Sequence, residues 1–298
     1  MTHVATLIAN PETPALDERL LVEARAALPR ADHPVWLDSG IAADLPFSPD
    51  RDADQRDLAA RVRAALGDAP VDVVVQPVAQ RRKALFIADM DSTMIGQECI
   101  DELADLVGLK QHVSAITERA MRGEIAFEPA LRERVALLKG LPESVVDQVI
   151  ASRITLTPGA QALVRTMKAH GAHTCLVSGG FSLFTRRVAA MIGFDEEYAN
   201  TLLIEDGKMT GKVQEPILGR EAKLSTLLDL TRRLGLEPQA TLAVGDGAND
   251  LAMIARAGLG VAYHAKPAVA EAAGGRIDHG DLTALLFLQG YKRTEFTQ

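Results

Sequence analysis

Two hydrophobic patterns divide the chain into two parts. Up to about residue 80, apolar runs typical of strands alternate with stretches in which apolar residues recur at helical spacing. The expected strands cover residues 4–9, 35–37 and 71–75, and the expected helices cover residues 16–28 and 52–66. We therefore predict a small α/β domain over residues 1–80.

From residue 84 onward, the apolar runs are short and continuous, and longer helical stretches separate them. These runs cover residues 85–88, 174–177, 241–244 and 259–262. Strands without polar alternation are buried on both faces, which is typical of a parallel sheet covered by helices. The sequence therefore predicts a doubly wound, Rossmann-like α/β domain over residues 84–298.

The interval between the first two of these runs is far longer than one crossover helix needs, so part of it must be an insertion. Its pattern is almost entirely helical, and we expect a helical cap at about residues 97–165. Pro158-Gly159 marks the expected return to the core.

Two local signals complete the organisation. Short apolar runs at residues 202–205 and 208–213 flank Asp206-Gly207, which predicts a tight hairpin. The cluster Arg81-Arg82-Lys83 lies between the two parts, and we expect a solvent-exposed linker there rather than a functional basic patch.

Composition narrows the class of protein. The 298 residues carry a net charge of -8, which argues against a partner that is nucleic acid or an anionic membrane. The N-terminus lacks the pattern of a secretory signal, and no uninterrupted apolar run reaches the roughly 18 residues of a membrane span. Cys99 and Cys175 have no spacing that suggests a disulfide framework or a zinc site. We expect a cytoplasmic protein with a small-molecule substrate and leave a homodimer open.

Polar residues able to handle phosphate follow three of the apolar runs. The segments are Asp89-Met90-Asp91-Ser92-Thr93, Ser178-Gly179-Gly180 and Gly245-Asp246-Gly247-Ala248-Asn249-Asp250. Each segment alone can be ordinary turn chemistry. The carboxyl ends of parallel strands, however, form the ligand crevice of an open sheet, so the three segments should meet at one place.

Each segment suits one part of a phosphate site. Asp89 and Asp91 can present a nucleophile and a second carboxyl group to the same ligand. Ser178 can donate a hydrogen bond to a phosphoryl oxygen, and Gly179 permits close backbone approach. The acids of the third segment crowd so closely that a cation must neutralise them, and their oxygen ligands favour magnesium. Lys223 opens a helical stretch and can add positive charge against the phosphoryl oxygens.

In this order, DMDST at 89–93, SGG at 178–180, Lys223 and GDGAND at 245–250 resemble the four motifs of the haloacid dehalogenase superfamily of phosphotransferases. Over residues 84–290 the chain more closely resembles the phosphoserine phosphatases of that superfamily. The resemblance implies a haloacid dehalogenase type of fold. It also implies a magnesium-dependent phosphoric monoester hydrolase that converts O-phospho-L-serine to L-serine and phosphate, the last step of serine biosynthesis.

The resemblance further implies roles for single residues. Asp89 would be the nucleophile that forms an aspartyl-phosphate, and Asp91 would be the general acid and base. Magnesium would be held by the Asp89 carboxylate, the backbone carbonyl of Asp91 and Asp246, with Asn249 and Asp250 close by. The phosphoryl group would be held by Ser178, Gly179 and Lys223.

Substrate selection, by the same resemblance, falls to Glu98 for the ammonium group, Arg134 for the carboxylate and Phe127 as an apolar wall, with Asn249 also beside the substrate. Arginine reads carboxylates through paired hydrogen bonds, and a glutamate complements an ammonium group. Each of these side chains also has an ordinary structural interpretation: a helix-start acid, a solvated helix residue and a core aromatic.

Several alternatives stay open at this point. A sister enzyme could act on another small phosphorylated metabolite or transfer the phosphoryl group to an alcohol. A phospho-accepting signalling domain uses similar residues, but Asp91 and the cap argue against it. Manganese could replace magnesium. Residues 1–80 resemble an ACT-type unit for regulation or dimerisation, and a structural appendage is the competing interpretation.

Overall fold

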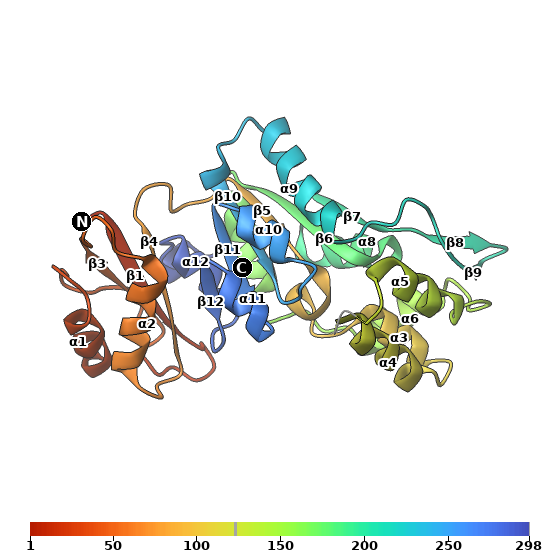
Figure 1. The fold of residues 1–298 in the computed structure, drawn as a ribbon, viewed down its shortest axis with the longest axis horizontal. Coiled ribbons are helices and arrows are strands. Elements are labelled where there is room, and N and C mark those ends of the chain that lie inside the picture. Colours follow the sequence, from red (N-terminus) through yellow and green to blue (C-terminus); the bar gives the residue numbers. More distant parts are fainter. Residues whose placement is uncertain (122–123, 298) are drawn as a thin grey trace.

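The structure, a computed structural model, describes residues 1–121 and 124–297. In this part of the chain the strands form three separate sheets. The N-terminal sheet and its helices lie at one end of the molecule, the largest sheet lies in the middle, and a group of helices with a hairpin lies at the other end (Figure 1).

The N-terminal sheet is antiparallel, with the strand order β2-β3-β1-β4, and two helices cover one of its faces. In chain order its elements are β1 (His3–Ala9), α1 (Glu18–Ala26), β2 (Val35–Asp38), β3 (Ala42–Phe47), α2 (Gln55–Leu66) and β4 (Val71–Pro77). The three predicted strands and two predicted helices are confirmed. The pattern missed β3, because Asp44 and Pro46 interrupt its apolar run.

The opposite face of this sheet packs against a segment near the C-terminus. Ile8 and Val74 belong to the same hydrophobic cluster as α12 (Ala284–Leu288). The buried carboxylate of Asp72 accepts a hydrogen bond from the backbone amide of Gly280 at 2.8 Å. Both faces of the N-terminal sheet are therefore covered.

The basic cluster between the two parts is not the solvent-exposed linker that the sequence predicted. Arg81 forms an ion pair with Asp44 of the N-terminal sheet at 2.6 Å, and both side chains are largely buried. Arg82 pairs with Glu295 at 2.6 Å, and the buried Lys83 donates a hydrogen bond to a backbone carbonyl at 2.7 Å. The prediction was wrong because all of these partners are distant in the sequence.

The central sheet has the strand order β12-β11-β10-β5-β6-β7, and every pair in it is parallel. Its strands are β5 (Leu85–Ala88), β6 (His173–Phe181), β7 (Glu196–Asn200), β10 (Thr241–Gly245), β11 (Leu259–Tyr263) and β12 (Gly275–Ile277). The chain enters at β5 in the middle of the sheet, so the predicted doubly wound architecture is confirmed. The pattern missed β7, which reads as polar, and the very short β12.

Helices cover both faces of this sheet (Figure 1). They are α7 (Ala160–Ala169), α8 (Ser182–Ile192), α9 (Arg220–Arg233), α10 (Leu251–Arg256), α11 (Pro267–Ala272) and α12, and short 3-10 helices lie at Pro238–Ala240 and Arg293–Glu295. Phe86 and Leu163 share one hydrophobic cluster, whereas Leu85 and Leu227 share another. Alternate side chains of β5 thus enter opposite layers of the core.

The described residues between β5 and α7 form four α-helices, in the interval where the sequence predicted a helical insertion. They are α3 (Cys99–Asp105), α4 (Lys110–Met121), α5 (Phe127–Ala136) and α6 (Val145–Arg153). The predicted hairpin at Asp206-Gly207 is confirmed as β8 (Leu202–Glu205) and β9 (Lys208–Val213). It packs beside α5, and the amide of Met209 donates to the carbonyl of Leu141, which follows that helix, at 2.8 Å.

Two further features bear on the predictions made from composition. Cys99 and Cys175 are both buried and unpaired. Within residues 1–121 and 124–297, every helix is too short or too polar to cross a bilayer.

Candidate active site

A cavity of about 330 Å³ lies at the carboxyl ends of β5, β6 and β10, next to α4 and α5. The predicted residues that line it are Asp89, Asp91, Glu98, Phe127, Arg134, Ser178, Gly179, Asp246 and Asn249. The three strand ends therefore meet, and the cap contributes to the same cavity. Lys223 is not among the lining residues, because its ammonium group lies behind the carboxylate of Asp89.

The first segment leaves β5 in a conformation that directs several side chains to this cavity. The amide of Asp89 donates to the carbonyl of Val244 at 3.0 Å, which ties the segment to β10. Ser92 lies in the left-handed backbone region with a φ of 55°, an uncommon conformation for a non-glycine residue. Its hydroxyl group donates to the Oε1 atom of Glu98 at 2.8 Å, so the turn also fixes that acid.

Lys223 is shared between two buried carboxylates. Its Nζ atom lies 2.5 Å from Oδ1 of Asp89 and 2.6 Å from Oδ1 of Asp250. Burial alone would lower the pKa of Lys223, but the two carboxylates raise it above its ordinary value. Gly245 makes room for this arrangement, since a Cβ atom there would lie 2.3 Å from Cγ of Asp250. Lys223 is therefore held charged beside Asp89.

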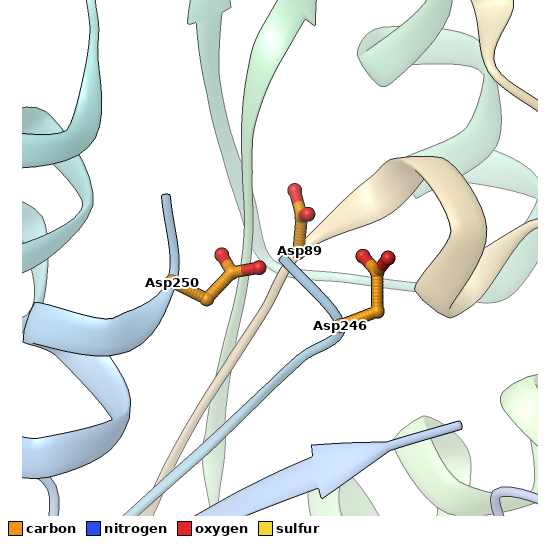
Figure 2. A group of neighbouring side chains, drawn as sticks. All are labelled: Asp89, Asp246 and Asp250. Carbon is orange, nitrogen blue, oxygen red and sulfur yellow. The ribbon is translucent and has the colours of Figure 1, made fainter. Parts of the chain in front are cut away.

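Three carboxylates gather at the sheet edge. Figure 2 shows Asp89, Asp246 and Asp250 directed toward the same space, and one oxygen atom of each lies within 4.8 Å of the others. Burial, with the added charge of Asp250, raises the pKa of Asp89 well above its ordinary value. Burial followed by the charge of Asp250 raises the pKa of Asp246 to about 6. Because one lysine cannot neutralise three acids, this set of oxygen donors fits a divalent metal ion.

Asp91 has different surroundings. Its Oδ1 atom is buried and has no hydrogen-bond partner among the described residues. Burial, and then the charge of nearby Glu98, raises the pKa of Asp91 to about 8. A carboxyl group that keeps its proton near neutral pH can donate that proton to an oxygen atom that enters the cavity.

The cap side chains are held by neighbours on the cap and on the core. Arg134 is 7% exposed, and its Nη1 and Nε atoms donate to Oγ1 of Thr117 at 3.0 Å and to the carbonyl of Ala130 at 3.1 Å. Phe127 reaches across to the core, where a Cβ atom on Gly179 would lie 3.1 Å from the edge of its ring. The cap thus touches the carboxyl end of β6.

The sequence missed several residues of this cavity. Thr117, Arg220 and Lys266 also line it, and two of them bring positive charge to a site rich in acids. Lys266 follows β11, so the strand-end argument used for the other segments could have found it. Arg220 lies three residues before Lys223 at the start of α9. Thr117 gave no signal, because its role depends on the contact between α4 and α5.

Comparisons with known proteins identify the family. The profile of the haloacid dehalogenase-like hydrolases matches residues 86–255. The chain is 45% identical over 239 residues to the phosphoserine phosphatase of Archaeoglobus fulgidus, and the alignment covers 78% of this chain and 69% of that protein.

Solved structures agree with this assignment. A haloacid dehalogenase family hydrolase from Salmonella enterica serovar Typhi superposes with a TM-score of 0.84 at 31% identity, covering 96% of this chain and 98% of that chain. A phospho-aspartyl intermediate analogue of phosphoserine phosphatase superposes with a TM-score of 0.65 at 40% identity, covering 69% of this chain and 98% of that chain. The chain therefore belongs to the haloacid dehalogenase-like hydrolases and, within that family, to the phosphoserine phosphatases.

Proposed function

We propose that this chain hydrolyses O-phospho-L-serine to L-serine and phosphate through a phosphorylated Asp89, with magnesium as its metal ion. The observation that carries the proposal is the contrast between two carboxyl groups of one cavity. Asp89 lies against the ammonium group of Lys223, whereas the Oδ1 atom of Asp91 has no hydrogen-bond partner in the described part of the chain and the pKa of Asp91 is raised to about 8. Acids in such contrasting surroundings suit a nucleophile and a general acid.

In the first step, the carboxylate of Asp89 attacks the phosphorus atom and forms an aspartyl-phosphate. The bond between phosphorus and the serine oxygen breaks, and Asp91 gives its proton to the departing oxygen, since an alkoxide would leave poorly. The ion pair with Lys223 favours the ionised form of Asp89 that makes this attack, against the opposing effects of burial and of Asp250. A relative that was solved as a phospho-aspartyl intermediate analogue supports the covalent route.

In the second step, the ionised Asp91 takes a proton from a water molecule, whose oxygen atom attacks the aspartyl-phosphate. This attack releases inorganic phosphate and restores the carboxylate of Asp89. Magnesium, held by Asp89, the backbone carbonyl of Asp91 and Asp246, would supply positive charge to the phosphoryl oxygens. Asn249, which lines the cavity beside these residues, would contact the bound phosphoryl group.

The carboxyl end of β6 is suited to hold the phosphoryl group. The Oγ atom of Ser178 accepts a hydrogen bond from the amide of Gly180 at 2.8 Å, which leaves the hydroxyl proton free to be donated to a phosphoryl oxygen. Gly179 brings its backbone close to the same cavity. With Lys223 behind Asp89, these groups place positive partial charge around the transferred group.

Three cap-side residues would select the rest of the substrate. Arg134 would bind the carboxylate through its Nη2 atom, since its Nη1 and Nε atoms already donate to Thr117 and Ala130. Glu98 would bind the ammonium group, and Phe127 would cover the side of the serine moiety. An amino acid esterified to phosphate carries all three matching groups.

The test is phosphate release from L-phosphoserine, D-phosphoserine, phosphoethanolamine and a sugar phosphate, with and without magnesium. We expect magnesium-dependent turnover that favours L-phosphoserine and is lost in Asp89→Asn. The control is Asp206→Asn, which makes the same change at an exposed hairpin acid. A preference for phosphoethanolamine would remove the proposed role of Arg134, and a wild-type protein that released phosphate from none of the four compounds would overturn the proposal.

A further inference from the structure

Asn200, the last residue of β7, is a buried amide outside the motifs described above, and it is 2% exposed. Its Nδ2 atom donates to the carbonyl oxygens of Gly179 at 2.9 Å and of Leu218 at 3.0 Å. Its Oδ1 atom accepts from the amide of Leu218 at 2.7 Å. Both polar ends of the side chain are therefore used, and they join two segments that are far apart in the sequence.

The first of these segments, at Gly179, interrupts the regular pairing of β6 with β7 close to Asn200. The pairing of β6 with β7 shifts register between Val177 and Phe181, and Asn200 stands opposite Phe181, where the pairing resumes. Ser178, Gly179 and Gly180 lie within this irregular stretch. Here the side chain of Asn200 supplies a hydrogen bond to Gly179 that the regular ladder of the two strands does not.

The second segment leads into the helix that carries Lys223. Leu218 is followed by Gly219, and α9 begins at Arg220, so Lys223 lies in the first turns of that helix. Asn200 pairs with both the amide and the carbonyl of Leu218, much as a neighbouring strand would. The entry of the chain into α9 is therefore fixed from the end of β7.

The ring of Phe127 lies against both segments. A Cβ atom on Gly179 would be 3.1 Å from this ring, and a Cβ atom on Gly219 would be 3.4 Å from it. Asn200 binds Gly179 itself, and it binds Leu218, the residue before Gly219. The spacing of the two segments thus also sets the place that the cap residue Phe127 occupies.

We propose that Asn200 is a positioning residue that sets the spacing between the phosphate-binding segment at Gly179 and the start of the Lys223 helix. The proposal rests on the proposed function, since it assigns Asn200 to the same site. Asparagine suits this task because its two donors and one acceptor match two carbonyls and one amide. Displacement of reacting groups by about 1 Å can lower a rate by about a hundredfold.

The experiment compares kcat and KM of Asn200→Ala and Asn200→Asp with those of the wild type. Aspartate fills the same volume and can accept from the amide of Leu218, but it presents an oxygen atom instead of a donor to the two carbonyls. We expect kcat to fall by about ten- to a hundredfold in both variants, with a smaller change in KM. The assay uses the substrate that the wild type hydrolyses fastest. If the proposed function is wrong, the wild type itself shows it by its choice of substrate, whereas the Asn200 proposal is judged by the ratio of variant to wild-type kcat.

Gln289→Ala is the matched control. Gln289 is another buried amide whose side chain accepts from the amide of Lys83 at 3.1 Å and donates to the carbonyl of Leu285 at 2.9 Å. It lies outside the cavity lining. We expect Gln289→Ala to lower the unfolding temperature about as much as Asn200→Ala does. Below that temperature, the kcat of Gln289→Ala should stay close to the wild-type value.

Three results would overturn the proposal. They are a kcat of Asn200→Asp within about threefold of the wild type, an equal loss of kcat in Gln289→Ala, and failure of both Asn200 variants to fold. The last result would assign Asn200 a purely structural role. If only Asn200→Ala fails to fold, Asn200→Asp decides the outcome by its kcat.

Discussion

Asp89 and Asp91 are two residues apart and have the same side chain, yet the charged neighbours of the two carboxyl groups differ. Asp89 has the ammonium group of Lys223 at 2.5 Å, which opposes the rise in the pKa of Asp89 that burial causes. The buried Oδ1 atom of Asp91 has no hydrogen-bond partner among the described residues, and burial and Glu98 raise the pKa of Asp91 to about 8. Burial without a counter-charge disfavours the ionised form, whereas a neighbouring ammonium group favours it. The division of labour in the proposed mechanism follows from this difference.

The role of Asp91 leads to a prediction about leaving groups. In Asp91→Asn, hydrolysis of phosphoserine should slow by about a hundredfold to ten-thousandfold, because the serine oxygen must leave without a proton. The phosphate ester of p-nitrophenol, whose leaving group needs no proton, should still phosphorylate Asp89. Rapid mixing should then show a burst of nitrophenolate equal to the enzyme concentration, followed by slow turnover.

The absence of that burst, together with equal losses of rate on the two substrates, would contradict the acid role of Asp91. The burst also separates the two steps of the mechanism. It reports formation of the phospho-enzyme, whereas the slow phase reports hydrolysis of that species, for which Asp91 is the proposed base.

Single residues of the strand-end motifs could be named from the sequence because their chemistry and their position agree. Asn200 and Thr117 could not be named in this way. Asn200 acts through Gly179 and Leu218, and Thr117 acts through Arg134. Such partners are set by how distant segments pack, and no local pattern records that packing.

At the scale of elements, the ends of β5 and β10 bring the carboxylates together. The continuous apolar runs of these strands made them visible in the sequence, and their parallel pairing fixes Asp89 beside Asp246. The sequence did not reveal β7, because its EEYAN sequence lies at the sheet edge, is half exposed and lacks a continuous apolar run. Edge strands depart most from the apolar pattern, and here one of them carries Asn200.

The gathering of carboxylates predicts that the metal-free protein loses stability as the pH rises. Burial raises the pKa of Asp246 from 3.8 to about 6, so its contribution to stability is full below about pH 4 and is lost as the pH rises through about 6. A change of about two in pKa corresponds to about 3 kcal/mol. With a chelator present, the unfolding temperature should therefore be lower at about pH 7.5 than at about pH 5.

Asp246→Asn should flatten this pH dependence, because the amide does not ionise. Magnesium should raise the unfolding temperature of the wild type more at the higher pH, since binding requires ionised carboxylates. Equal stabilisation by magnesium at both pH values, together with an unchanged slope in Asp246→Asn, would contradict the assignment of Asp246 to the metal site. Thermal unfolding followed by calorimetry or circular dichroism measures both effects.

At the scale of the whole molecule, we propose that residues 1–80 form one domain and that residues 84–298 form the phosphatase domain, with a helical cap at about residues 97–165. The N-terminal sheet shares a hydrophobic cluster with α12, and Asp72 accepts a hydrogen bond from Gly280 in the segment that precedes this helix. Its regulatory or dimerising role stays a prediction. The change of hydrophobic pattern indicated a boundary near residue 80, but the sequence did not indicate how extensively the two parts contact each other.

Substitution of Arg81 tests how much the contacts between the two parts contribute to stability. It bridges the two parts, since its guanidinium group pairs with Asp44 at 2.6 Å and its Nε atom donates to the carbonyl of Leu288 at 2.6 Å. Removal of one partner from a buried pair leaves the other charge buried and uncompensated. Arg81→Met should therefore lower the free energy of unfolding by about 3 kcal/mol, measured by urea denaturation.

Arg30→Met is the matched control, because Arg30 pairs with Asp50 at 2.8 Å with side chains that are 58% and 79% exposed. This exposed pair should contribute no more than about 1 kcal/mol. If Arg81→Met changed stability as little as Arg30→Met, the two domains would be joined chiefly by the apolar contact with α12. If it instead produced two separate unfolding transitions, the ion pair would be what makes the two domains unfold together, since two-state unfolding requires that the parts be coupled.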